Sequence, residues 1–151
     1  HHQRHQPVFV GTTQRKLDDK GRIVLSAGLR DELDGTGYIT VTDGCLAIFT
    51  NEGYEQFTDR VRHRVREVGD LDPIVLRKLA SDSDHIRADA QGRLTLPAKF
   101  LDKVGINAAA GTEVVVNGAF DRIEIWAPEV WDALSSEGND ALQDAIRQGG
   151  L

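Results

Sequence analysis

The chain contains one segment twice, and this internal repeat constrains the fold more than any other feature of the sequence. Residues 17–33 read LDDKGRIVLSAGLRDEL and residues 88–104 read ADAQGRLTLPAKFLDKV, so the two align without gaps. The match resumes downstream, where residues 45–49 (CLAIF) correspond to 122–126 (RIEIW) and Tyr54 to Trp131. Half of a 151-residue chain is too small to bury much apolar surface alone. We therefore expect the two copies to share one core about a pseudo-twofold axis.

Each copy shows the same order of predicted elements: strand, tight turn, strand, short helix, hairpin and longer helix. A glycine in each tight turn allows positive φ, and Asp43-Gly44 is a strong hairpin signal. Ser26 and Pro97 suit the start of the short helices. The expected strands are 8–17, 22–25, 38–42 and 46–50 in the first copy and 85–88, 93–96, 113–117 and 122–126 in the second, and the longer helices are 52–68 and one starting at Pro128.

These elements divide the chain into five segments. The histidine-rich start predicts an added tag or a disordered tail. Apolar residues at helical spacing between the copies predict a short helix in the linker, and acidic residues after the second copy suggest a tail that frays. The expected segments are the tag or disordered tail at 1–7, a first half at 8–69, a helical linker at 70–84, a second half at 85–134 and a flexible acidic tail at 135–151.

The charge of the chain is unevenly distributed. The formal net charge is −6 and the sequence pI is near 5.3, which taken alone argues against nucleic acid as the main partner. From residue 101 onward there are three basic side chains and nine acidic ones, whereas the first hundred residues carry 15 of each. Binding responds to local fields, so the first hundred residues remain able to bind an anionic partner.

The repeat carries the constellation Asp-x-x-Gly-Arg in both copies, with Asp18 and Arg22 in the first and Asp89 and Arg93 in the second. One interpretation is structural, because the aspartate can accept hydrogen bonds from its own turn while the arginine pairs with a carboxylate. In this view Asp18, Gly21, Asp89 and Gly92 shape two turns at a symmetric interface. We assign these four residues a structural role whatever the arginines do.

A second interpretation gives the arginines a ligand. Four basic side chains occupy eight positions of the first copy, namely Arg15, Lys16, Lys20 and Arg22. Guanidinium and ammonium groups on an exposed turn suit phosphate oxygens and guanine edges. The second copy retains Arg87 and Arg93 but has Gln91 in place of the lysine, so we expect the first copy to supply more of the charge.

The sequence offers little support for an enzyme. It contains no P-loop, no GxSxG motif and no dinucleotide fingerprint. The single cysteine, Cys45, excludes a multi-cysteine zinc site and lies in an apolar strand, where packing is a better explanation than nucleophilic chemistry. The basic run over 60–66 is interpreted as a solvated helix face. We expect no catalytic residue, no metal, no cofactor and no membrane span.

The blocks LDDKGR and DAQGRLTLPAKF, followed by EVVVNGAFDRIEIWAPEVW, resemble the MraZ family of bacterial transcriptional regulators. The start Phe9-Val10-Gly11 is also similar to that family's amino terminus, and the resemblance covers about residues 8–134. It implies an α+β fold, a two-repeat AbrB/MazE-like swapped-hairpin β-barrel flanked by short helices. It also implies a cytoplasmic, nucleoid-associated ring homo-oligomer. By the same resemblance the residues that face DNA are Arg22 and Arg93, with Arg15, Lys16 and Lys20 alongside.

Two functions follow as hypotheses. The first is a sequence-specific regulator of transcription that binds double-stranded DNA at promoter repeats of the division and cell-wall gene cluster. The alternative is an antitoxin-like protein-interaction module of the same barrel class, in which the acidic tail binds a basic partner. The family usually has proline where this chain has Ser26, and a longer side chain where it has Gly28; these departures concern the stability of the first short helix.

Overall fold

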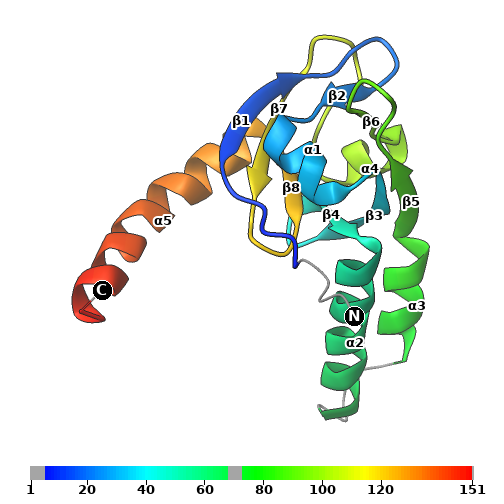
Figure 1. Ribbon diagram of the computed structural model, residues 1–151. Helices are drawn as coiled ribbons and strands as arrows, with labels where there is room; N and C mark the ends of the chain where they lie inside the picture. The colour runs from blue at the N-terminus through cyan, green and yellow to red at the C-terminus, as the bar shows by residue number, and fades with distance from the viewer. Residues whose placement is uncertain (1–5, 68–72, 151) are drawn as a thin grey trace, which may run out of the picture.

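The computed structural model describes residues 6–67 and 73–150. In this part of the chain a six-stranded antiparallel sheet and a two-stranded ribbon enclose one core, with helices around them (Figure 1). The elements in chain order are β1 (Thr12–Lys16), β2 (Arg22–Val24), α1 (Ala27–Leu33), β3 (Thr36–Thr42), β4 (Cys45–Thr50), α2 (Asn51–Glu67), α3 (Ile74–Ser81), β5 (Ser83–Arg87), β6 (Arg93–Thr95), α4 (Ala98–Lys103), β7 (Glu113–Gly118), β8 (Ile123–Trp126) and α5 (Pro128–Gln148).

The two copies exchange their first strands. The strand order of the large sheet is β1-β7-β8-β4-β3-β5, so β1 of the first copy pairs with β7 of the second, and β5 of the second pairs with β3 of the first. The registers are equivalent as well. Thr12 lies opposite Asn117 in the β1–β7 pair, and their counterparts in the repeat, Ser83 and Thr40, lie opposite each other in the β5–β3 pair. The α+β class and the two-repeat swapped-hairpin arrangement are thereby confirmed.

The pseudo-twofold axis passes through two strand pairs. In the ribbon, Ile23 lies opposite Leu94, its counterpart in the other copy. In the sheet, Ala47 of β4 lies opposite Glu124 of β8, and these positions are also equivalent. The side chains of Ile23 and Leu94 are completely buried, so the centre of the core consists of contacts between the two copies.

The short helices close the core on either side of the ribbon. Leu29 and Leu33 of α1 are buried, as are Phe100 of α4 and Val104 just after it, as their i, i+4 spacing predicts. A smaller cluster on the sheet joins Cys45, Val115 and Trp126, with Trp131 of α5 packed against it. This second cluster attaches the first turn of α5 to the sheet.

Two features of the backbone explain where the first strands and hairpins begin and end. Asp43 and Gly44 both have positive φ, of 50° and 86°, as the predicted two-residue hairpin turn requires. β1 is shorter than the strand expected over 8–17, because Gly11 has a φ of 90° and interrupts the extended chain. Before that glycine, Phe9 forms an isolated bridge with Phe120 and is fully buried.

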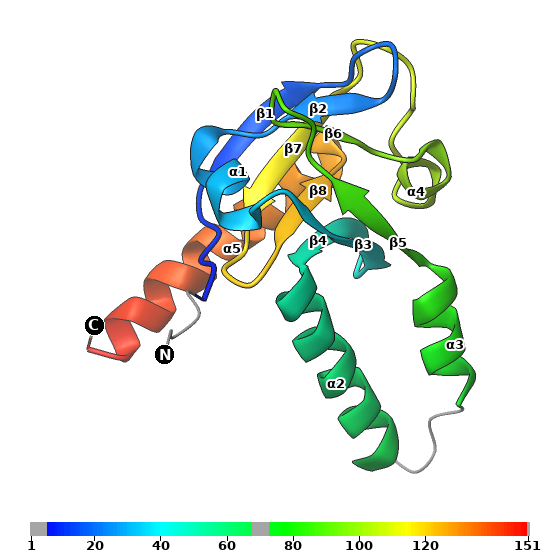
Figure 2. The same ribbon diagram turned by 45° about the vertical axis from the view of Figure 1, so that its right-hand side comes forward.

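The linker between the copies contains the predicted helix. α3 packs against α2, and together they form an arm that extends from the end of the sheet (Figure 2). At the base of the arm, the Tyr54 hydroxyl donates a hydrogen bond to the Ser83 hydroxyl at 2.7 Å, and the rings of Tyr38 and Tyr54 stack with centroids 4.3 Å apart. Residues 1–5 of the expected tag and residues 68–72 of the linker lie outside the described part of the chain.

The acidic segment after the second copy differs from the expectation. Residues 135–148 lie within the outer part of α5, which comprises residues 134–148, so helical structure replaces the frayed tail that the sequence suggested. Pro128 stands at the start of α5 and Glu129 lies in its first turn, which favour helix initiation and complement the helix dipole. In both views α5 leaves the body of the molecule on a different side from the arm (Figures 1 and 2). No helix in the described ranges is long and apolar enough to cross a membrane.

The exchange of strands predicts that the two halves unfold together. Leu94→Ala removes a fully buried side chain at the axis and should lower the free energy of unfolding by about 2–5 kcal/mol. Val24→Ala lies on the exposed face of the same ribbon and should cost less than about 1 kcal/mol. Urea unfolding followed by circular dichroism and by tryptophan fluorescence measures both. Two separate transitions in the unsubstituted chain would contradict a shared core.

Candidate nucleic-acid interface

The two Asp-x-x-Gly-Arg segments form identical turns. Oδ1 of Asp18 accepts hydrogen bonds from the backbone N–H groups of Lys20 at 2.9 Å and Arg22 at 2.8 Å. In the second copy Oδ1 of Asp89 accepts the corresponding bonds from Gln91 and Arg93, both at 2.9 Å. Each aspartate therefore satisfies the backbone donors of its own turn, which is the structural role that the sequence suggested.

The motif arginines are held by the same aspartates. Nε of Arg22 donates to Oδ2 of Asp18 at 2.7 Å, and Nε of Arg93 donates to Oδ2 of Asp89 at 2.7 Å. The two arginine side chains are 22% and 30% exposed. Within the described ranges the structure records no hydrogen bond from their terminal Nη groups. The aspartates thus fix the direction of each guanidinium and leave its outer donors to solvent or to a ligand.

The glycines of the two motifs lie where the copies cross. Gly21 and Gly92 have φ values of 72° and 76°, which favour glycine. The carbonyl of Gly21 accepts a hydrogen bond from the N–H of Leu96 at 2.9 Å, and that of Gly92 accepts one from the N–H of Leu25 at 3.0 Å. Each turn is therefore anchored to the other copy.

The hydrogen bonds of the turns stabilise the ionised carboxylates. Burial raises the pKa of the Asp18 carboxyl, but bonds from the Arg22 and Lys20 backbone and from the Arg22 guanidinium outweigh it, so the pKa falls to about 2. The pKa of Asp89 is also lowered, first by the hydrogen bond from the Arg93 backbone. Both motif carboxylates are ionised at neutral pH, and each offsets part of the positive charge of its arginine.

The ribbon places both arginines on one outer face. Arg22 of β2 lies opposite Thr95, and Arg93 of β6 lies opposite Val24, while Ile23 and Leu94 between them point into the core. Arg22 and Arg93 are offset by two residues along the ribbon, about 7 Å at the usual rise per residue. Both turns lie at the end of the molecule away from the arm (Figures 1 and 2).

The other predicted basic residues surround this face. Arg15 reaches from β1 to the ribbon, where its Nε donates to the carbonyl of Val24 at 2.8 Å. Because Val24 lies opposite Arg93, this bond brings a first-copy arginine beside the second-copy motif. Lys16 and Lys20 are exposed, and the described part of the chain provides neither with an ion-pair partner. The structure therefore gathers the predicted residues around one ribbon.

The structure adds one basic residue that sequence reasoning missed. Nη2 of Arg30 on α1 donates to the carbonyl of Ala90, inside the second-copy turn, at 3.2 Å. The aliphatic part of Arg30 also covers Gly92, where an added Cβ would lie 2.8 Å from its Cδ. Arg30 aligns with Leu101 in the repeat, so the comparison of the copies carries no signal for it. The second-copy turn, which lacks a lysine, receives this positive charge from the first copy.

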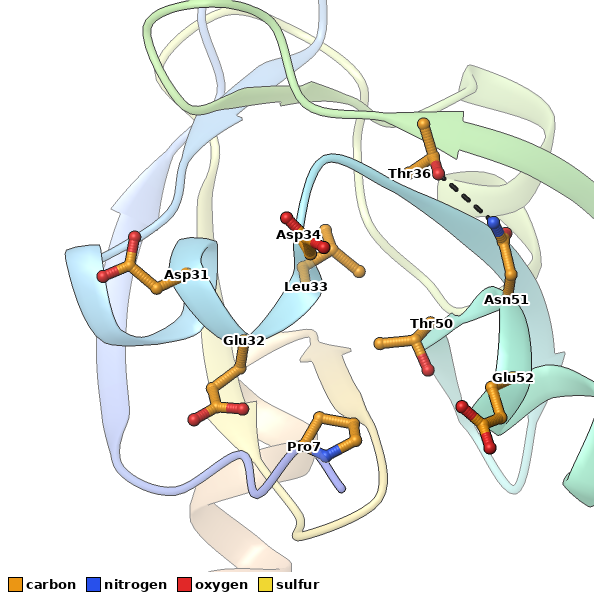
Figure 3. A pocket seen from close by; sticks show the side chains of 9 residues that line it. All are labelled: Pro7, Asp31, Glu32, Leu33, Asp34, Thr36, Thr50, Asn51 and Glu52. Carbon is orange, nitrogen blue, oxygen red and sulfur yellow. Dashed lines mark hydrogen bonds between the residues drawn. The ribbon is translucent and has the colours of Figure 1, made fainter. Parts of the chain in front are cut away.

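An acidic hollow elsewhere on the molecule offers a contrast. It lies between the end of α1 and the start of α2, and four carboxylates line it, those of Asp31, Glu32, Asp34 and Glu52. Figure 3 shows them spread around the hollow, with Asp31 turned away, and Asn51 donating to Thr36 at 3.3 Å. In the described ranges no three His, Cys, Asp or Glu side chains converge as a metal site would require. The hollow would repel a phosphate.

Two other candidates do not form a site of their own. Arg60 pairs with Asp121 and Arg62 with Asp59, both at 3.1 Å and on the exposed surface of the arm, as expected for a solvated helix face. Cys45 is buried, and burial raises the pKa of its thiol to about 12. The thiol is therefore protonated at neutral pH and is not a nucleophile.

The turn geometry predicts a specific response to acid. The ordinary pKa of an aspartate is 3.8 and that of folded Asp18 is about 2, so its stabilising effect is complete above pH 4 and is lost as the pH falls toward 2. Asp18→Asn should flatten the decline in the free energy of unfolding over this range. The exposed neighbour provides the matched control, because Asp19→Asn should leave the decline unchanged. Urea unfolding at pH 5, 3.5 and 2.5 tests this, and equal slopes for Asp18→Asn and the unsubstituted chain would refute it.

Comparison with known proteins places the chain in a family. The family model described as "MraZ protein, putative antitoxin-like" matches residues 8–67 and 79–148, so the match extends into the acidic part of α5 beyond residue 134. A relative from Corynebacterium efficiens named transcriptional regulator MraZ is 39% identical over 146 residues, covering 91% of this chain and 94% of the relative. Relatives of the same name come from Mycobacterium avium, 35% identical over 92% of this chain and 100% of the relative, and from Clavibacter michiganensis, 32% identical over 93% and 96%. With both copies matched and nearly its whole length covered, the chain belongs to the MraZ family.

Proposed function

We propose that this chain is a transcriptional regulator that binds double-stranded DNA through the outer face of the β2–β6 ribbon. The observation that carries the proposal is the pair of identical turns, each presenting a guanidinium whose Nε is held by an aspartate. An arginine fixed in this way has little side-chain freedom left to lose on binding. Its outer donors suit a phosphate or the O6 and N7 atoms of guanine. The names of the relatives support regulation of transcription.

The charges around the ribbon divide into two roles in this proposal. Arg22 and Arg93 read bases or position the protein at two points about 7 Å apart along the ribbon. Lys16 and Lys20 contact phosphates, because exposed ammonium groups on mobile stems act as point charges. Arg15 and Arg30 hold their turns through backbone carbonyls and add to the positive potential.

One subunit presents few cations against a net charge of −6, so strong binding requires several subunits on one DNA. We propose a homo-oligomeric ring that binds promoter repeats of the division and cell-wall gene cluster. Linked subunits raise the effective concentration of each further contact. Such a regulator acts in the cytoplasm at the nucleoid, without a cofactor, and carries out no catalysis.

The role of the motif arginine is separable from its role in the turn. Arg22→Ala and Asp18→Asn both break the same ion pair, but only the first removes the guanidinium. If Arg22 contacts DNA, Arg22→Ala should weaken binding at least tenfold more than Asp18→Asn, whereas a purely structural role makes the two losses equal. Fluorescence anisotropy with labelled promoter DNA measures both. Lys99→Ala, on α4 and 4.0 Å from Asp84, is the control and should bind normally.

The salt and repeat dependence of binding test the rest of the proposal. Each phosphate that the protein neutralises contributes about 0.9 to the slope of log affinity against log salt concentration. Lys20→Ala should therefore make this slope shallower by about 0.9 for every subunit that contacts the DNA. Affinity should rise steeply from DNA with one repeat to DNA with several. Scrambled DNA of equal length is the reference. Equal affinity for promoter repeats and scrambled DNA at moderate salt would refute the proposed function.

A further inference from the structure

The longer helices of this protein leave apolar side chains uncovered. α1 and α4 bury leucines and phenylalanine in the core, whereas α2, α3 and α5 bury no residue at all. On the outer part of α5, Leu134, Gly138 and Leu142 follow one another at helical i, i+4 spacing. The two leucines are 44% and 56% exposed. An amphipathic helix gains most of its stability by packing its apolar face, and this line on α5 has no such partner among residues 6–67 and 73–150.

The internal repeat shows how the same line is covered in the first copy. α2 and α5 are equivalent helices, and their first aromatic residues pack alike: the ring of Tyr54 lies 6.2 Å from that of Phe49, and the ring of Trp131 lies 6.1 Å from that of Trp126. Counting on from these positions, Leu134, Gly138 and Leu142 correspond to Phe57, Val61 and Val65.

On α2 this line is partly covered by a second helix. Phe57, Val61 and Val65 line a groove together with Val75 of α3, and all four side chains are half-buried. No element of the described chain packs on the corresponding line of α5. The first copy therefore supplies a template in which another helix packs beside this face of the helix and partly covers it.

The charges indicate which surface covers it. α5 carries five acidic side chains, Glu129, Asp132, Glu137, Asp140 and Asp144, and its one basic residue, Arg147, is paired with Asp144 at 3.0 Å. The arm carries an excess of basic residues. Its basic side chains are Arg60, Arg62, Arg64 and Arg66 on α2 and Arg77 and Lys78 on α3, against four acidic ones on α2, Glu52, Glu55, Asp59 and Glu67.

The arm also offers apolar surface and unpaired charge. Arg64, Arg66 and Arg77 have no ion-pair partner among the described residues. Ile74, at the start of α3, is 52% exposed. The outer part of α5 is about 22 Å long and α2 about 26 Å at 1.5 Å per residue, so the two surfaces match in length as well as in charge.

We propose that the outer part of α5 of one copy packs along the α2–α3 arm of a second copy, with Leu134 and Leu142 against the apolar side chains of the arm. The two surfaces are different patches on different sides of the molecule (Figures 1 and 2). Such a contact is head-to-tail and closes into a ring when its rotation divides a full turn. It leaves the β2–β6 ribbon of every copy uncovered. This inference rests on the self-assembly part of the proposed function and assigns its interface.

The mass of the full chain in solution tests the contact. The unsubstituted chain should form an assembly of several 16.6 kDa copies, and Leu142→Asp should reduce it to single chains. The substituted side chain is exposed and far from the core, so circular dichroism should be unchanged. Val10→Asp, also at an exposed valine outside α5, is the matched control and should keep the full mass. A Leu142→Asp chain that keeps the full mass overturns the proposal and leaves α5 for a different, basic partner.

Crosslinking identifies the partner surface. Mixing chains that carry Leu142→Cys with chains that carry Ile74→Cys, followed by mild oxidation, should give a covalent pair of one chain of each kind. The native Cys45 is buried and does not interfere. Pairs formed only between two Leu142→Cys chains would overturn the proposal in favour of α5 packing on α5. Charge reversal adds a second check, since Asp140→Arg should weaken assembly and Arg64→Glu in the same chain should restore it.

The two proposals fail in different ways. Specific binding to promoter repeats by a chain that stays monomeric would overturn this interface and leave the DNA-binding face intact. An assembly that depends on Leu142 but does not distinguish promoter repeats from scrambled DNA would support the interface and refute the proposed function.

Discussion

Each copy of the repeat donates its first strand to the hairpin of the other copy, and the rest of the structure depends on this exchange. Neither copy can complete its part of the sheet alone, because β1 is hydrogen-bonded to β7 and β5 to β3. The buried pair Ile23 and Leu94 lies on the axis that relates the copies. Burial of apolar surface, the main stabilising term in folding, is therefore realised here between the copies rather than within either one.

The motif turns are a direct consequence of the exchange. After its first strand each chain segment must reverse direction to enter the ribbon, and the reversal leaves backbone donors without partners in the ladder. Asp18 and Asp89 accept those donors, and they also fix Arg22 and Arg93 on the outer face. The same hydrogen bonds that complete the fold thus hold two guanidinium groups in place, which is why one motif serves both interpretations of the sequence.

Charge is separated along the molecule in a way that the net value of −6 hides. Basic residues gather around the ribbon and outnumber acidic ones on the α2–α3 arm, while acidic residues concentrate on α5. A head-to-tail contact between α5 and the arm would neutralise much of the acidic charge and leave the ribbon as the exposed basic surface. Self-assembly and binding to an anionic partner then support each other, because the first removes a field that opposes the second.

Much of the fold could be predicted from the residues alone. The repeat, the glycine turns, the hairpin at Asp43-Gly44 and the i, i+4 pairs of α1 and α4 are local or periodic signals, and such signals report local structure. They predicted the order of the elements and the structural role of the motif aspartates.

Other features depend on contacts between residues far apart in the chain, and local patterns do not encode them. Arg30 reaches the second-copy turn only because the strand exchange brings α1 beside it, and its counterpart Leu101 gives no hint of this. Arg15 is beside Arg93 for the same reason. The helix over residues 135–148 was missed because its polar and acidic composition resembles that of a disordered tail. The apolar line on that helix becomes apparent only when α2 and α5 are compared as equivalent helices, since α3 partly covers this line on α2. Periodicity can identify a helix face, but the identity of what packs against that face is a property of the assembled tertiary structure.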